Sequence, residues 1–287
     1  MAEPRPPDAA LAERMEERLR AWGVRPDSTR ETESSLVAFG TRGGQPVVVK
    51  LVRRRGDEWD SGAVLAAFGG RGMVRVLGHV PGAMLLERLH PATLLAGMAI
   101  AGRDDEATEI LADVIGRIST PAPPPPGCAT VEEWARSFDR YLASGDTRIE
   151  RGLAGHARGV YRELCASQRE PRLLHGDLQH YNVLLDARRG WTAIDPKGVA
   201  GEAEYELGAA LRNPVERPEL FASAAAVERR LAIFRARLGI DVDRARAWAF
   251  AQAVLSAIWG AEDGFDVRPD DPPLLLAAAI RPLLRGT

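Results

Sequence analysis

The stretch LLHGDLQHYNVLL at residues 173–185 most constrains this chain, because it places polar side chains inside an apolar segment. The leucines and valine at its two ends are typical of short buried strands. Its middle holds five polar side chains, most of them able to hold a proton or a metal, and these are His175, Asp177, Gln179, His180 and Asn182. A surface hairpin loop is one explanation. A catalytic loop held between two short strands is the other, and it also explains the choice of residues.

The composition sets broad limits on what the chain does. Its 287 residues suffice for two lobes, and its net charge of −2 argues against a nucleic-acid binder that relies on a large basic surface. Cys128 and Cys165 form no C-x-x-C pair, so no zinc site or disulfide framework is expected. No apolar signal segment opens the sequence, and the apolar run 274–280 is too short to span a bilayer. We expect a cytoplasmic protein with no membrane, nucleic-acid or obligate protein partner.

The apolar patterns predict an α+β fold made of two lobes. Helical spacing predicts a helix over 8–22, and a further helix over 57–68 interrupts four short runs typical of strands, which are 35–39, 47–52, 73–80 and 83–87. Beyond residue 90, two short strands flank the opening stretch, a third covers 191–194, and the rest is mainly helical, over 104–118, 131–143, 155–168, most of 219–263 and 273–285. We expect a β-rich lobe at 1–88, a hinge near 87–91 and a helical lobe at 89–287.

Three residues in order point to phosphoryl transfer. Asp177 lies five residues before Asn182, and Asp195 follows thirteen residues later, after a short strand. A carboxylate and a carboxamide so placed can hold Mg²⁺ through oxygen, while a second carboxylate accepts the proton of the attacking hydroxyl. The D-x-x-x-x-N spacing matches the catalytic loop of kinases. A single aspartate would more often be a turn former, so the prediction depends on the three residues together.

A lysine near the end of a predicted strand extends this site. In VVVK, Lys50 is placed to bind the α- and β-phosphates of ATP or GTP, with Glu58 as its expected partner from the next helix. A solvated charge at a strand end would explain Lys50 equally well if it stood alone. Ser34 and Ser35 are candidate phosphate donors, although an ordinary turn explains them equally well. Backbone groups of Glu87 and Leu89, after a strand, are expected to meet the adenine edge, which is the last part of the nucleotide site.

Several motifs together resemble the aminoglycoside phosphotransferase family of kinase-like enzymes. HGDLQHYNVLL, IDPKG, VVVK and LLERL carry the general resemblance. GRGMVRVLGH, IDPKGVAGEAEYELGAALRNP and LSAIWGAEDG are similar to the branch of streptomycin 6-kinases and hydroxyurea phosphotransferases. The matches run from about residue 35 to 264. The resemblance implies a bilobal protein-kinase-like fold and an ATP-dependent enzyme that phosphorylates a hydroxyl of a small molecule, most simply an aminoglycoside such as streptomycin.

Carried over to this sequence, the resemblance implies roles for individual residues. It makes Asp177 the base, and Asn182 and Asp195 the Mg²⁺ ligands. It makes Lys50 with Glu58 the phosphate clamp. A proline follows Asp195 where a protein kinase has D-F-G, and no A-P-E motif is present, so a protein substrate is not expected.

The acceptor site is the least determined part. Acidic residues crowd 200–219 and 262–271, and if they border the cleft they form a negative wall suited to a cation. Glu262, Asp263 and Trp259 are the expected substrate contacts, together with Gln179 and His180. A solvated acidic loop explains the charges equally well. The open alternatives are a kinase for hydroxyurea or another small alcohol or amino alcohol, and a kinase-like module that binds a ligand without turnover.

Overall fold

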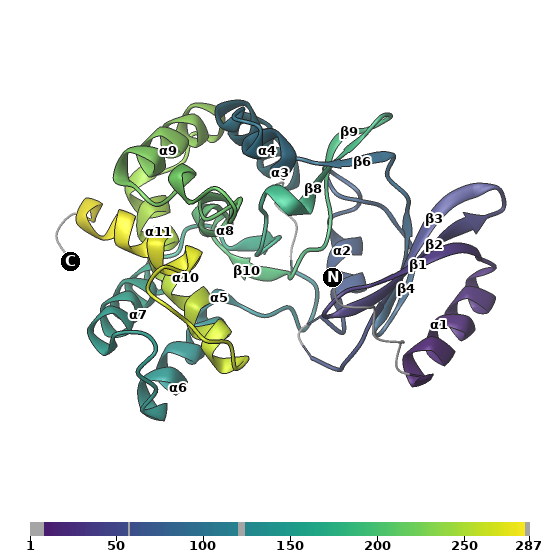
Figure 1. The fold of residues 1–287 in the computed structure, drawn as a ribbon, viewed down its shortest axis with the longest axis horizontal. Helices are drawn as coiled ribbons and strands as arrows, with labels where there is room; N and C mark the ends of the chain where they lie inside the picture. The colour runs from purple at the N-terminus through teal and green to yellow at the C-terminus, as the bar shows by residue number, and fades with distance from the viewer. Residues whose placement is uncertain (1–8, 57, 120–123, 285–287) are drawn as a thin grey trace.

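The computed structural model describes residues 9–56, 58–119 and 124–284. Figure 1 shows a strand-rich part on the right, built by the N-terminal third of the chain, and a helical part on the left. Of the expected elements, residue 8, Asp57 and residue 285 lie outside the described residues. Within that description, no helix is both long enough and apolar enough to cross a membrane.

A five-stranded antiparallel sheet forms the N-terminal lobe, in the order β1-β2-β3-β5-β4. Its strands are β1 (Arg25–Glu31), β2 (Ser35–Arg42), β3 (Gln45–Val52), β4 (Val76–Val80) and β5 (Ala83–Glu87). Helix α1 (Ala9–Trp22) covers the outer face of the sheet (Figure 1). The apolar stripe of α1 packs there against alternate strand residues, and that small core includes Leu11, Met15, Leu19, Val47, Val49 and Leu51.

The inner face of the same sheet looks toward the helical lobe. Helix α2 (Ser61–Ala67) lies on this side, and its Val64 and Leu65 join the large core of the molecule. Successive side chains of a strand point to opposite faces. Because Val49 and Leu51 face α1, the side chain of Lys50 between them points inward. The strand alternation therefore directs this lysine toward the space between the lobes.

Short strands connect the two lobes. In one small sheet, β6 (Pro91–Leu94) pairs with β8 (Val183–Asp186), which pairs with β9 (Gly190–Ala193). In the other, β7 (Arg172–Leu174) pairs with β10 (Val199–Gly201). The strands on either side of the polar stretch are therefore in different sheets. We propose the lobe boundary at residues 88 and 89, which is supported by the end of the large sheet at Glu87.

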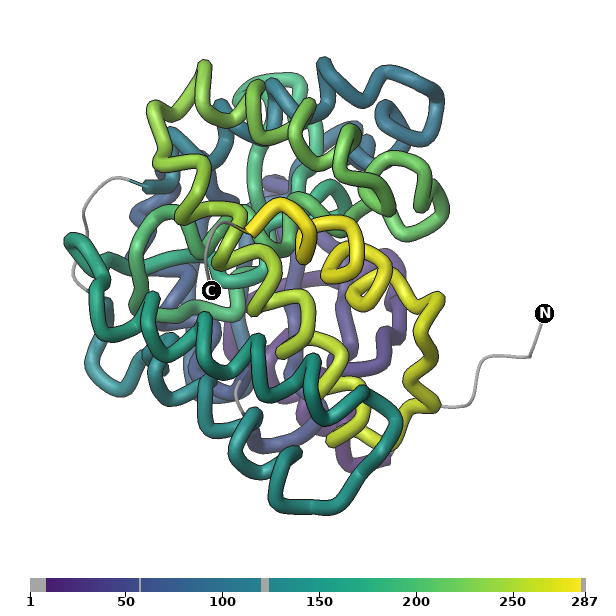
Figure 2. Tube along the Cα trace, turned by 90° about the vertical axis from the view of Figure 1, so that its left-hand side faces the viewer, coloured from purple at the N-terminus to yellow at the C-terminus, as the bar shows by residue number. Residues whose placement is uncertain are grey.

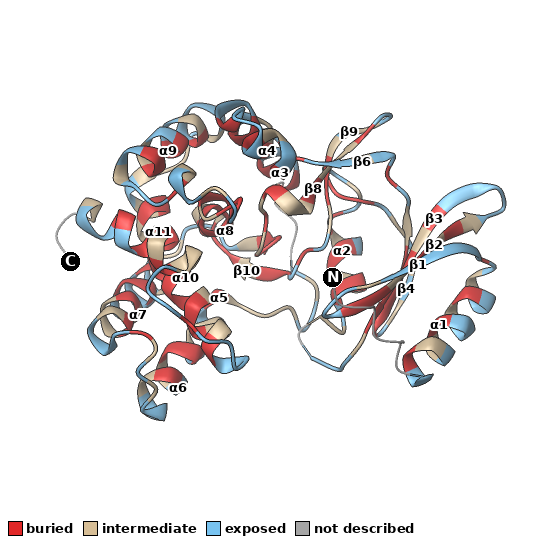
Figure 3. Cartoon of the chain, in the orientation of Figure 1, coloured by how far each residue is buried: buried red, intermediate tan, exposed pale blue. Residues whose placement is uncertain are grey.

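The helical lobe is built around α10 (Val242–Glu262), which is buried on almost every side (Figure 3). Seen from the helical end in Figure 2, α10 and its neighbours lie in front of the N-terminal sheet. Alanines at many positions of α10 allow close packing of the surrounding helices. The other helices are α3 (Ala96–Ile100), α4 (Asp104–Ile118), α5 (Val131–Trp134), α6 (Arg136–Ser144), α7 (Arg151–Ala166), α8 (Leu207–Leu211), α9 (Ala224–Leu238) and α11 (Pro272–Ile280).

Most expected elements are present, with some corrections. The helix expected over 131–143 is interrupted at Ala135, and a capping box between Thr130 and Glu133 begins the first piece. The strand expected from Met73 begins only at Val76, because Met73 instead bridges to the C-terminal lobe. Strands β1, β6 and β10 and helices α3 and α8 were not expected.

Candidate active site

The polar stretch forms a loop between β7 and β8, as the pattern of the sequence suggested. Gly176 has φ +79, and a Cβ there would lie 3.0 Å from Trp134 and 3.1 Å from Val199. Glycine therefore allows both the left-handed turn and the close packing. The Gln179 side chain accepts a hydrogen bond from Tyr181 N at 2.7 Å and begins the short 3₁₀ turn His180–Asn182. Local hydrogen bonds thus fix the path of the loop.

Asp177 and Asn182 are held together within this loop. Asn182 Nδ2 donates to the backbone oxygen of Asp177 at 2.8 Å. The backbone oxygen of Asn182 accepts from Ile194 N at 2.9 Å, which ties the loop to the segment after β9. The Asp177 carboxylate is a quarter exposed, and Arg212 Nη2 lies 3.4 Å from its Oδ1. The carboxylate is therefore held by Arg212 on one side and remains partly exposed.

Asp195 lies at the turn that follows β9. Its φ is +59, in the left-handed region that aspartate tolerates better than most residues. The fully buried His175 ring bonds through Nε2 to Ile194 O at 2.8 Å, and its own backbone oxygen accepts from Gly198 N at 3.0 Å. Burial lowers the pKa of His175, so the ring is neutral at pH 7. His175 therefore joins the two loops and is not available for proton transfer.

Lys50 reaches Asp195 from the other lobe. Its almost buried ammonium group donates to Asp195 Oδ1, across 145 residues of sequence. Glu58 Oε2 lies 3.9 Å from the same Nζ atom. The structure thus brings together the lysine, the glutamate and the aspartate that the sequence singled out.

The residues proposed as Mg²⁺ ligands have suitable donor chemistry. Asp195 offers a half-exposed carboxylate, and because the amide nitrogen of Asn182 is already bonded, its carboxamide oxygen remains as the donor. Within the described residues, no group of three His, Cys, Asp or Glu side chains is arranged to hold a metal. Mg²⁺ needs few protein ligands, because it takes phosphate oxygens and retains water. A two-ligand site beside bound phosphates fits these residues.

A buried acid packs against the loop that carries Asp177. Glu206 is 2% exposed, and its Oε2 accepts from Gly176 N at 3.3 Å. Burial raises the pKa of Glu206 to about 8, and the nearby Asp177 contributes to the shift. The neutral, protonated form of Glu206 therefore places no second negative charge near Asp177.

A cavity of about 720 Å³ lies beside this cluster and is lined from both lobes. The expected substrate residues Trp259, Glu262 and Asp263 all line it. Five acidic side chains face two basic ones in its wall, and these are Glu58, Asp60, Glu133, Glu262 and Asp263 against Arg140 and Lys197. The cavity therefore has an excess of negative charge.

Aromatic side chains give this cavity a flat wall. The rings of Trp134 and Trp259 meet edge to face, with centroids 5.3 Å apart. Trp259 Nε1 donates to Ser137 Oγ at 3.1 Å, which fixes the orientation of its ring. Lys197 Nζ lies 5.2 Å from the centroid of the same ring, so this indole face already accepts a cation. Trp134 and Lys197 were not expected here, although Lys197 stands only two residues after Asp195.

The expected acidic wall needs correction. The carboxylate of Glu262 is paired with Arg140, whose Nε lies 2.9 Å from Oε1. Glu202 and Glu206 are buried and bond to groups in the protein interior. No acid of 200–219 lines the cavity. The negative wall instead includes Glu133. This residue lies in the first turn of α5, far in sequence from the acidic runs 200–219 and 262–271, so those runs did not indicate it.

Two other expectations are wrong. His180 is 1% exposed and neither ring nitrogen is accessible, so it offers nothing to a substrate. Burial lowers its pKa to about 3, and the positive charge of Arg230 adds to the shift. Ser35 is buried, and its hydroxyl bonds to Thr32 Oγ1 at 2.7 Å, so it is a turn residue and not a phosphate donor. Ser34 is exposed in the turn between β1 and β2, and its role stays a prediction.

The hinge residues also have structural contacts. Glu87 Oε1 accepts from Arg75 N at 2.8 Å and pairs with Arg189 of the β8–β9 turn. The N–H of Glu87 donates to Arg75 O at 3.0 Å, so its carbonyl is the group left to meet an adenine. Leu89 is 8% exposed. The adenine contacts of Glu87 and Leu89 stay predictions.

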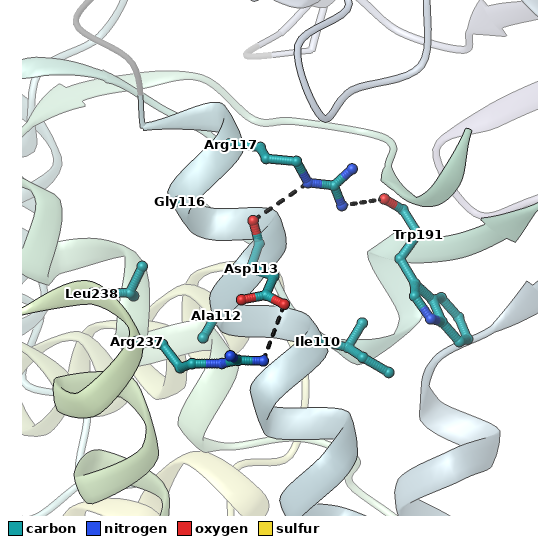
Figure 4. Close-up of a pocket in the computed structure, with 8 residues that line it drawn as sticks. All are labelled: Ile110, Ala112, Asp113, Gly116, Arg117, Trp191, Arg237 and Leu238. Atoms are coloured by element: carbon teal, nitrogen blue, oxygen red, sulfur yellow. Dashed lines mark hydrogen bonds and ion pairs between the residues drawn. The ribbon is translucent and has the colours of Figure 1, made fainter.

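A second cavity, of about 450 Å³, lies away from these residues between α4, α9 and β9 (Figure 4). Arg237 Nη2 lies 3.2 Å from Asp113 Oδ2, and Arg117 bonds to the backbone oxygen of Trp191. None of the expected site residues lines this cavity, so it does not belong to the candidate active site.

Comparison with known proteins gives one consistent family. A sequence model of the family described as aminoglycoside/hydroxyurea antibiotic resistance kinase matches residues 21–264. Streptomycin 3''-kinase of Klebsiella pneumoniae is 37% identical over 238 residues, which cover 81% of this chain and 86% of the relative. Streptomycin 6-kinase of Streptomyces griseus is 34% identical over 256 residues, which cover 85% of this chain and 80% of the relative.

Comparison with solved structures gives the fold. A thermostable mutant of aminoglycoside phosphotransferase APH(4)-Ia, in ternary complex with ADP and hygromycin B, matches with a TM-score of 0.67 at 17% identity. The match covers 95% of this chain and 99% of that chain. The bilobal kinase-like fold expected from the sequence is confirmed.

Proposed function

The chain belongs to the aminoglycoside/hydroxyurea antibiotic resistance kinase family, and we propose that it phosphorylates a hydroxyl group of streptomycin or a related aminoglycoside with ATP. Its family makes it a small-molecule kinase with an alcohol group as acceptor. The observation that carries the choice of acceptor is the cavity lined by Glu58, the partner of Lys50, in which acids outnumber bases. Aminoglycosides are polyhydroxylated polycations, and a cleft of negative charge attracts them.

The residues divide the work of phosphoryl transfer among them. Lys50, with Glu58 near its ammonium group, binds the α- and β-phosphates. Asp195 and Asn182 would hold Mg²⁺, which neutralises charge on the phosphates when bound. Asp177 orients the acceptor hydroxyl and takes its proton, and its partial exposure supports this role.

The nucleotide is proposed to lie between the sheet and the hinge. We propose that Ser34 in the β1–β2 turn covers the phosphates and that the backbone of Glu87 and Leu89 contacts the base. We also propose a cytoplasmic location, where the nucleotide is available.

The cationic acceptor is proposed to meet three acids in particular. Glu262 is paired with Arg140, and Glu58 lies beside Lys50. Asp60, Glu133 and Asp263 are the other acids of the wall, and in the described part of the chain no ion pair within 4 Å involves them. Each exposed pair with a cationic acceptor would contribute about 1 kcal/mol or less, and more where water is excluded.

A neutral acceptor such as hydroxyurea is the second candidate. The two basic side chains in the cavity wall favour it, because they repel a cationic acceptor. One of them, Lys197, already occupies the face of Trp259 on which such a cation would stack. A kinase-like module without turnover is disfavoured, because Lys50 and Asp195 are in contact and the Asp177 carboxylate is partly exposed.

The proposal is tested by ATP consumption with purified protein against streptomycin, other aminoglycosides, hydroxyurea and amino alcohols. We expect turnover with streptomycin, and a rate lower by roughly 10²–10⁴-fold in Asp177→Asn, the usual contribution of a general base. Turnover with hydroxyurea alone would contradict the choice of acceptor. An undiminished rate in Asp177→Asn would contradict the role of the base.

The charge of the cavity is tested by the double variant Asp60→Asn with Asp263→Asn. We expect a higher KM for streptomycin, an unchanged KM for ATP, and an effect that shrinks with salt because the Debye length is about 8 Å at physiological ionic strength. Asp270→Asn is the matched control, since this exposed acid lies outside the cavity wall. Equal streptomycin KM values in the double variant and the control would favour a neutral acceptor.

A further inference from the structure

Arg212 is the cation that the structure places against the proposed base. It follows directly after α8, and its Nη2 lies 3.4 Å from Asp177 Oδ1. Its side chain is 13% exposed, so the contact is largely shielded from solvent. Its position against Asp177 requires a further explanation.

A buried amide fixes the other edge of the guanidinium group. Arg212 Nη1 donates to Gln252 Oε1 at 3.2 Å, and Gln252 on α10 is 2% exposed. Gln252 Nε2 in turn donates to Tyr205 O at 3.5 Å. A Cβ at Gly208 would lie 1.7 Å from Gln252 Oε1, so the glycine makes room for this side chain. Arg212 is therefore held between a fixed amide and the carboxylate of Asp177.

A buried ion pair fixes the backbone on both sides of Arg212. Arg230 Nη1 donates to Leu211 O at 3.2 Å and to Asn213 O at 2.8 Å. Arg230 is 1% exposed and bonds to Asp104 of α4, with 2.5 Å between Nη2 and Oδ1. Both neighbours of Arg212 are thus tied to the interior of the helical lobe, which leaves its side chain little freedom to move.

From these contacts we infer that Arg212 is a positioning residue that holds one oxygen of the Asp177 carboxylate and aims the other at the acceptor hydroxyl. This inference rests on the proposed function, in which Asp177 is the base. A carboxylate in a loop rotates freely unless one oxygen is held. A charged hydrogen bond to a fixed guanidinium supplies that restraint.

A double-mutant cycle with Asp177→Asn tests this inference. Arg212→Met is expected to lower kcat roughly 10–100-fold, the range expected when a catalytic group is misplaced by up to about 1 Å, with KM for ATP unchanged. Arg212→Met is expected to have no further effect in the Asp177→Asn background. Arg212→Lys is expected to recover part of the rate, because a cation remains without the fork geometry. Arg217→Met is the control, as a nearby arginine whose partner Glu219 is exposed.

Each result distinguishes the inference from the function on which it rests. If Arg212→Met lowers kcat by the same factor with and without Asp177, or raises KM for ATP instead, Arg212 does not act through the base and the inference is overturned. If Asp177→Asn alone keeps the parent rate, the proposed function fails first. Thermal melting of each variant identifies a rate lost through unfolding, and Arg212→Lys then serves as the deciding variant. Equal rates in parent and Arg212→Met also overturn the inference.

Discussion

Asp104→Asn is expected to lower the free energy of unfolding by about 3–5 kcal/mol, because it leaves a buried guanidinium without its counter-charge. Asp104 is 4% exposed on α4 and Arg230 is 1% exposed on α9. Arg230 donates from Nη2 to Oδ1 at 2.5 Å and from Nε to Oδ2 at 3.1 Å. Two hydrogen bonds between charged groups at about 1.5–3 kcal/mol each give a comparable range of about 3–6 kcal/mol. Asparagine keeps the shape of the aspartate side chain and one of its two acceptor oxygens. The loss of stability therefore measures the missing charge and not a cavity.

The pH dependence of this effect follows from the pKa of Asp104. Burial raises this pKa, but hydrogen bonds to Arg230 and Arg229 and their charges outweigh it, and the net shift is downward. A carboxyl group with a lower pKa in the folded state contributes stability above its unfolded pKa, about 3.9, and loses it as the pH falls through the folded value. The difference between parent and Asp104→Asn is therefore expected to be constant near neutral pH and to shrink below about pH 4.

Asp105→Asn is the matched control, one residue away on the same helix. Asp105 also pairs with Arg229, but its side chain is 61% exposed, so the change is expected to cost about 1 kcal/mol or less. Urea unfolding followed by tryptophan fluorescence measures both variants at pH 7. If Asp104→Asn falls within 1 kcal/mol of Asp105→Asn, the argument that this buried pair stabilises the helical lobe is refuted.

Three further predictions concern the site itself. Asp195→Ala is expected to weaken Mg²⁺-ATP binding in calorimetry more than Asn182→Ala, since it removes a full charge, and equal affinities in Asp195→Ala and the parent would count against the metal role. The pKa of Glu206 is raised to about 8, so its protonated form contributes stability that is lost as the pH rises from about 4.5 through 8. Melting temperatures of Glu206→Gln are therefore expected to fall less than those of the parent over this range, and parallel curves would contradict the shift. Gly208→Ala is expected to cost about 1–3 kcal/mol, because its Cβ collides with the buried Gln252, and an unchanged melting temperature would show that this side chain can retreat.

The spacing of apolar residues predicted those helices and strands that have a regular apolar pattern of their own. The helix Asp104–Ile118 was predicted with its observed bounds, because its apolar residues recur along one face. Strand β1, RPDSTRE, was missed because six of its seven residues are exposed and none gives an apolar alternation. It is a strand because β2 supplies its hydrogen-bond partners along most of its length. An edge strand of this kind is determined by its neighbour, and single-sequence patterns do not contain that information.

The site was predictable where chemistry constrains a short stretch of sequence. Asp177 and Asn182 are five residues apart, and their spacing carried the prediction. The pairing of Arg140 with Glu262 joins residues 122 positions apart, and no local pattern indicates it. The burial of His180 was equally hidden, because a polar residue in a polar loop gives no sign of facing inward.

The proposed base Asp177 and the proposed metal ligand Asp195 lie on adjoining loops but are held by different parts of the molecule. Asp195 is positioned by Lys50 and by the turn that His175 ties to the catalytic loop. The side chain of Asp177 is positioned from the opposite side, by Arg212 and through it by α10 and the buried pair beneath α8. A change on the α8 side is therefore able to misplace the base while nucleotide binding persists. Nucleotide binding is thus expected to depend on the contacts around Asp195, and turnover also on the contacts around Arg212. A variant that loses turnover but keeps nucleotide binding has therefore disturbed the Arg212 contacts.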